Sequence, residues 1–89
     1  MKIQAELSLY PLKTDSIESA VKRFIEELEK SDVSVSPGPM STLVNGESEQ
    51  VFQVISRCFA DAGATGEIVL VAKFSNACPA KDEFNREKK

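Results

Sequence analysis

Several residue types on which metal sites and hydrolases depend are scarce in this sequence of 89 residues. It contains no histidine and no tryptophan, and it has two cysteines, Cys58 and Cys78, with no CxxC pair. A tetrahedral zinc site within one chain therefore lacks ligands. Without histidine there is no imidazole to act as a general base, which argues against hydrolysis by a triad. We expect a non-enzymatic protein with no metal and no resident cofactor.

Long apolar runs and basic patches are also missing. The longest uninterrupted apolar run, 68–72, is far too short to cross a bilayer, and Met1 is followed by an alternating pattern instead of an export leader. These features predict a cytoplasmic protein without membrane insertion. The formal net charge is -3 and the basic cluster 86–89 lies at the terminus, so nucleic acid is not an expected partner.

The length predicts one small domain. We expect it to span residues 1–80, followed by a charged C-terminal tail over 81–89. A domain of this size buries only about 60 to 65 % of the surface that its unfolded chain exposes. Self-association is therefore a reasonable expectation.

Alternation and helical spacing predict six elements in the order strand, helix, strand, strand, helix, strand. The strands are expected at 2–10, 33–36, 40–44 and 67–75, and the helices from about Ser16 to 28 and from 47 to 63. Thr14 and Asp15 offer an N-cap for the first helix, with Glu18 at capping-box spacing from Asp15, and Gly63 is expected to end the second helix as a left-handed C-cap. The buried stripes of the two helices are predicted to contain Ile17, Ala20, Val21, Phe24, Ile25 and Leu28, and Val51, Ile55, Cys58, Phe59 and Ala62, with Phe52 and Val54 widening the second stripe.

This order is the split βαβ arrangement of ferredoxin-like α+β domains, written βαββαβ. Right-handed crossovers predict a four-stranded antiparallel sheet with strand order four, one, three, two and with both helices on one face. The other face is then open, and it includes the apolar Val69 and Val71. We expect a homodimer or homotetramer that forms through this open sheet face.

Candidate binding residues gather on the central strands of the predicted sheet. Glu6 lies on the open face, where it either pairs with Lys73 on the last strand or accepts hydrogen bonds from a cationic ligand. Ser8 shares that face. Ser41 and Thr42 are adjacent on a neighbouring strand and must point to opposite faces, so one of them at most joins Glu6.

Two other functions of ferredoxin-like domains fit the residues poorly. Copper and zinc carriers of this topology need a pair of cysteines in the loop after the first strand, and residues 11–14 of this chain contain no sulfur. An RNA-binding sheet needs exposed aromatic residues on its central strands, where only Tyr10 comes close. Cys58 lies on a helical stripe and is expected to be buried, whereas Cys78 stays open between packing and ligand contact.

Three short motifs occur in order along the chain: LSLYPL at 7–12, MST at 40–42 before Val44 and Gly46, and FSNACP at 74–79. Together they resemble the YkoF-like family of thiamine and hydroxymethylpyrimidine-binding proteins, and the resemblance spans about residues 3 to 80. Longer members of that family contain two such repeats in one chain, whereas this chain has one. A single repeat needs self-association to reproduce the arrangement, which agrees with the apolar open face.

The resemblance implies a ferredoxin-like domain that binds the pyrimidine part of thiamine, in connection with thiamine uptake or salvage. The expected small-molecule ligand is thiamine or its hydroxymethylpyrimidine moiety. The candidate contacts are Glu6, Ser8, Tyr10, Ser41, Thr42, Asn76 and Cys78. An oligomerisation or regulatory interaction module without a small ligand is the alternative.

Overall fold

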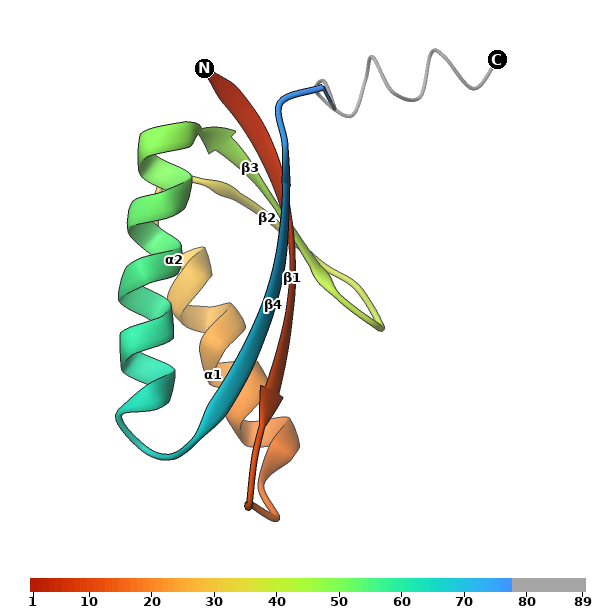
Figure 1. Cartoon of the computed structure of the whole chain (residues 1–89), viewed down its shortest axis with the longest axis vertical. Helices are drawn as coiled ribbons and strands as arrows, with labels where there is room; N and C mark the ends of the chain where they lie inside the picture. The colour runs from red at the N-terminus through yellow and green to blue at the C-terminus, as the bar shows by residue number, and fades with distance from the viewer. Residues whose placement is uncertain (78–89) are drawn as a thin grey trace.

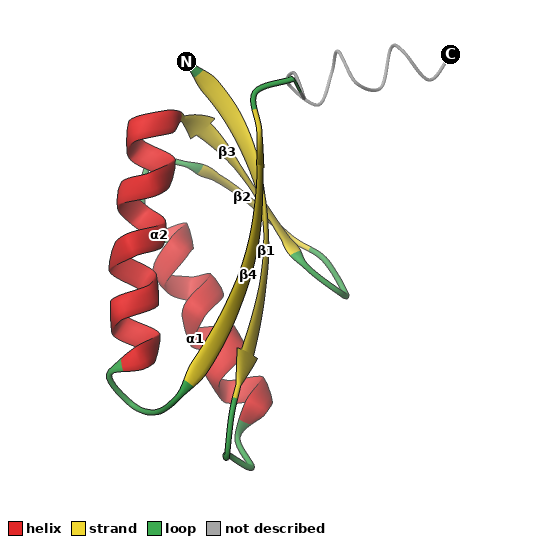
Figure 2. Cartoon of the chain, in the orientation of Figure 1, coloured by secondary structure: helices red, strands yellow, loops and turns green. Residues whose placement is uncertain are grey.

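A computed structural model describes residues 1–77, which form one antiparallel sheet with two helices on one of its faces (Figures 1 and 2). The elements are β1 (Lys2–Pro11), α1 (Ile17–Glu29), β2 (Ser34–Pro37), β3 (Thr42–Glu47), α2 (Ser48–Gly63) and β4 (Ile68–Ser75). The predicted order of elements and the ferredoxin-like fold are confirmed. β3 runs directly into α2, but Asn45 and Gly46, which the sequence predicted to end the strand, pair with Gln4 and Ile3 inside β3, so the corner lies at Glu47 and Ser48.

The sheet has the order β2-β3-β1-β4 and all neighbouring strands are antiparallel. Ala5 in the middle of β1 lies opposite Val44 of β3 and Phe74 of β4. Since side chains alternate along a strand, Ile3, Ala5 and Leu7 of β1 point toward the helices and are buried. Neither helix covers the opposite face of the sheet (Figure 2). By the same alternation, even-numbered residues of β1, including Glu6 and Ser8, lie on that open face.

The core lies between the helices and the sheet. Its largest fully buried side chains are Leu7, Leu28, Val44, Val51 and Cys58. The helical stripes are narrower than the sequence indicates. Ile17 at the start of α1 is 52% exposed, and Phe52 and Phe59 of α2 are 51% and 45% exposed, whereas Val54 is buried as predicted. Phe24 and Leu28 are the buried residues of α1, so the apolar stripe reaches the core in the later turns of the helix and not at its start.

The two predicted helix caps are wrong. The N-cap of α1 is Ser16, without a side-chain hydrogen bond, and the Ser16 N–H donates to Thr14 Oγ1 at 3.0 Å. Thr14, predicted together with Asp15 as the N-cap, thus accepts a hydrogen bond from the residue that caps α1 and is not itself the cap. No glycine within residues 1–77 has a positive φ, so Gly63 is not a left-handed C-cap. Instead the helical turn continues into Ala64, whose N–H reaches the Ala60 carbonyl at 3.0 Å.

Candidate functional site

Glu6 occupies the centre of the open sheet face. Its neighbours across the ladder are Leu43 on β3 and Lys73 on β4, and its side chain is 43% exposed. Glu6 Oε2 accepts a hydrogen bond of 2.9 Å from Ser41 Oγ, and Oε1 lies 3.8 Å from Lys73 Nζ. The predicted pairing with Lys73 is therefore present, and Ser41 contacts the other oxygen of the same carboxylate.

Ser41 and Thr42 lie on opposite sides of the sheet, as alternation predicts. Thr42 is opposite Leu7 and is buried in the core, with 6% of its surface exposed. Ser41 is on the open side, where its hydroxyl donates to Glu6. Of the two adjacent hydroxyl residues, Ser41 joins the carboxylate and Thr42 belongs to the fold.

The turn between β2 and β3 holds these groups beside β1. The Gly38 N–H donates to the Ser41 carbonyl at 2.9 Å and closes the turn, while Ser8 Oγ lies 3.5 Å from the Met40 carbonyl. The turn extends beyond the sheet on the side away from the helices (Figure 2). Pro37 and Pro39 fix their own φ angles on either side of Gly38, so the turn has little freedom to move.

Two hollows flank this turn and share residues 38–41. One, of about 190 Å³, is lined by Leu7, Ser8, Leu9, Tyr10, Val21, Phe24, Ile25 and residues 38–42. The other, of about 330 Å³, lies on the open face and is lined by Glu6, Ser36, Leu43 and residues 37–41. We call the two hollows and the turn between them the turn site. It brings together five of the predicted contacts: Glu6, Ser8, Tyr10, Ser41 and Thr42.

Asn76 is not part of the turn site within one chain. It follows Ser75, which pairs with Gln4 near the start of β1, and its Nδ2 lies 3.5 Å from the sulfur of Met1. Tyr10 lies at the opposite end of β1, where it pairs with Val69 near the start of β4. Cys78 lies outside the described residues. Cys58 is buried as expected, and this burial raises the pKa of its thiol, which disfavours the reactive thiolate.

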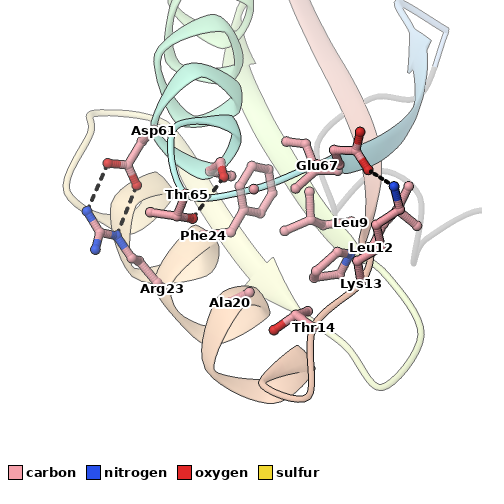
Figure 3. A pocket seen from close by; sticks show the side chains of 14 residues that line it. Leu9, Leu12, Lys13, Thr14, Ala20, Arg23, Phe24, Asp61, Thr65 and Glu67 are labelled. Atoms are coloured by element: carbon pink, nitrogen blue, oxygen red, sulfur yellow. Dashed lines mark hydrogen bonds and ion pairs between the residues drawn. The ribbon is translucent and has the colours of Figure 1, made fainter.

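A larger cavity of about 430 Å³ lies between the start of α1, the end of α2 and the loop before β4 (Figure 3). Arg23 binds both carboxylate oxygens of Asp61 at 3.0 and 3.1 Å, and Lys13 pairs with Glu67 at 3.0 Å. The hydrogen bond to Asp61 also raises the pKa of the Arg23 guanidinium. Each of these four charges thus has a partner within the chain.

No sequence motif points to this cavity, because Arg23 and Asp61 are 38 positions apart and neither has a local motif. Leu9 and Phe24 line both this cavity and the smaller hollow of the turn site, and so form the wall between them. Residues 1–77 contain no group of three His, Cys, Asp or Glu side chains arranged to hold a metal ion. Within the same residues, neither helix has the length and apolarity needed to cross a bilayer.

Comparison with known proteins gives one family match. The profile of the family described as thiamine-binding protein matches residues 5–74, which include most of β1, the turn site and most of β4. A search of curated proteins gives no match.

Solved structures similar to this chain share its fold over nearly their whole length. A protein of Streptococcus pneumoniae has a TM-score of 0.84 at 18% identity, with 98% of this chain and 99% of that one covered. A candidate thiamine biosynthesis/salvage protein of Thermotoga maritima has a TM-score of 0.84 at 17% identity, with 100% of both chains covered. A domain of unknown function from Bacillus cereus has a TM-score of 0.82 at 23% identity, covering 100% of this chain and 91% of that one. At these identities the likeness shows the fold alone.

Proposed function

Because this chain belongs to the thiamine-binding protein family, we propose that it binds thiamine or its hydroxymethylpyrimidine part at the turn site. The proposed role is non-enzymatic and cytoplasmic, in thiamine uptake or salvage. The family match supports the class of ligand, and the contacts of Glu6 at the turn support the position of the binding site.

The hydrogen bond from Ser41 to Glu6 is the observation that supports this location best. It fixes Oε2 of the carboxylate at 2.9 Å from the hydroxyl and leaves Oε1 directed to the open face beside the larger hollow. An aminopyrimidine offers an amino donor and ring-nitrogen acceptors in one plane. The amino group matches the carboxylate, and the ring nitrogens match hydroxyl donors such as Ser8.

The sizes of the two hollows support a bound pyrimidine ring. Pockets for whole drug-sized ligands usually have volumes of about 300–1,000 Å³. The open hollow of about 330 Å³, which Glu6 lines, is large enough for the pyrimidine ring, and the adjoining hollow of about 190 Å³ next to Tyr10 is available for the rest of thiamine. Tyr10 is 53% exposed, so its ring is accessible for stacking on the ligand.

We also propose that the protein is a homo-oligomer that associates through its open sheet face. Tyr10 and Val69 are direct cross-strand partners, and Val71 lies two residues further along β4. All three are about half exposed, and together they form an apolar strip on this face. An exposed apolar strip of this kind also favours the alternative function, an interaction module without a small ligand.

Isothermal titration with thiamine and with hydroxymethylpyrimidine tests the proposed ligand. With wild-type protein at about 100 µM, the titration detects affinities down to the weak end of the useful range. We expect binding of at least one ligand, and we expect Glu6→Gln to weaken it about fivefold, because a charged acceptor becomes a neutral one. Glu29→Gln, on the exposed end of α1, is the matched control and should bind like wild type.

The result for each variant has a distinct meaning. No heat with either ligand in the wild-type protein would sink the proposed function and leave the interaction module. Binding that is unchanged in Glu6→Gln would keep the function but remove Glu6 from the site, and would assign its carboxylate to Ser41 and Lys73 alone.

A further inference from the structure

Lys73 lies directly across the ladder from Glu6, in the C-terminal half of β4. Its side chain is 78% exposed, and its Nζ is on the same face as the open hollow of the turn site. Within residues 1–77 the other lysine on this face is Lys2, which is opposite Glu47 at the far end of β1. Lys73 is therefore the cation that a ligand on Glu6 would meet.

The contact between Lys73 and Glu6 is an ion pair and not a hydrogen bond. The distance of 3.8 Å from Nζ to Oε1 is longer than the range of about 2.7–3.2 Å for such bonds. Ser41 uses Oε2. Among residues 1–77, no side chain donates a hydrogen bond to Oε1, so a ligand donor has an acceptor available there.

A neutral donor and a cationic ligand meet different electrostatics at this acceptor. A neutral amino group gains the hydrogen bond to Oε1 while Lys73 keeps its ion pair. A ligand with a permanent positive charge is also attracted by Glu6, but Lys73 has already neutralised much of that charge and repels the newcomer. The attraction by Glu6 and the repulsion by Lys73 therefore act on the ligand at the same place on the open face.

We propose that Lys73 is a specificity-determining residue of the turn site, which favours the neutral aminopyrimidine over the cationic, thiazolium-bearing form of the ligand. This inference rests on the proposed function, because it concerns the same carboxylate. It goes further by assigning a preferred charge to the ligand and a residue that sets this preference.

Isothermal titration of wild type and Lys73→Met with both ligands at low ionic strength tests the inference. We expect Lys73→Met to bind thiamine about two- to fivefold more tightly, the range typical of exposed ion pairs. Its affinity for hydroxymethylpyrimidine should stay within about twofold of wild type, since Oε1 accepts the same amino donor. Lys73→Arg should keep the wild-type preference because it keeps the charge.

Two controls separate this effect from general ones. Lys22→Met, on the exposed surface of α1, changes the net charge equally and should leave both affinities unchanged. At about 1 M salt, where the screening length is about 3 Å, wild type and Lys73→Met should converge for thiamine. Circular dichroism checks that each variant is folded.

Several outcomes would overturn the inference. Equal changes for both ligands in Lys73→Met would make Lys73 a structural residue, and an equal change in Lys22→Met would reduce the effect to net charge. Affinities that stay at the wild-type values for both ligands would remove Lys73 from ligand selection while the proposed function stands. If wild-type protein binds neither ligand, the proposed function fails first and the inference fails with it.

Discussion

Ser41 and Thr42 are neighbours in the chain with separate tasks. Thr42 fills a core position opposite Leu7, so its methyl group and its β-branched shape matter to stability. Ser41 contacts Glu6 from the open side, where its hydroxyl is accessible to a ligand. Substitution of each residue should therefore affect a different property of the protein.

We expect Ser41→Ala to weaken ligand binding about fivefold with little change in stability, because a hydrogen bond to a partly exposed carboxylate is lost. Thr42→Ala should lower the free energy of unfolding by about 1–2 kcal/mol, through loss of buried atoms, and leave the affinity of the folded protein unchanged. Urea denaturation and isothermal titration of both variants measure the two effects. A Thr42→Ala variant that is stable but binds poorly would contradict this division.

At the scale of the element, the β2–β3 turn positions the site. The Gly38 N–H donates the hydrogen bond that closes the turn, and the Ser41 carbonyl accepts it. A Cβ added at Gly38 would lie 2.9 Å from the same carbonyl oxygen. No glycine in residues 1–77 has a positive φ, so the need for glycine here comes from this contact and not from the backbone angle. Gly66, in the loop before β4, offers a matched comparison because an added Cβ meets nothing within 4 Å.

Gly38→Ala should lower the free energy of unfolding by about 1–3 kcal/mol, the usual range for an overpacked position, and weaken ligand binding. The carbonyl that must shift belongs to Ser41, so the Ser41 hydroxyl moves with it. Gly66→Ala should be neutral or stabilise by up to about 1 kcal/mol, because the unfolded chain loses freedom. Thermal melts and titration of both variants provide the measurement; equal behaviour of the two would remove the turn from the site.

At the scale of the whole molecule, the two faces of the sheet differ in what covers them. Both helices lie on one face (Figure 1), and their core includes Leu28 and Val51. The opposite face carries the half-exposed strip of Tyr10, Val69 and Val71 beside the charged pair of Glu6 and Lys73. A second copy that covers this strip would also approach the turn site.

Val71→Glu should therefore shift the protein toward the monomer, because a carboxylate would be buried in the proposed interface. Sedimentation velocity at tens of micromolar measures the change. Phe59→Glu is the control: Phe59 is 45% exposed, close to the 47% of Val71, but it lies on α2 on the helical side. A wild-type protein that sediments as a monomer, or two variants that dissociate alike, would argue against assembly through this face.

The sequence by itself determined the elements, their order and the faces of the strands. A period of two residues in β1 placed Glu6 and Ser8 opposite the core, and the same alternation in β4 placed Lys73 on the face of Glu6. The same period required Ser41 and Thr42 to separate. These features depend on local backbone geometry and on connection rules, which act over short stretches of chain.

Only the tertiary structure decided which hydroxyl meets the carboxylate, because that depends on the register between β1 and β3. It also removed Asn76 from the turn site within one chain, exposed Phe59, and formed the Arg23–Asp61 pair from two different helices. Each of these features results from contacts between segments that are distant in sequence. Local patterns carry no information on how closely such segments approach, and packing of the whole chain sets that distance.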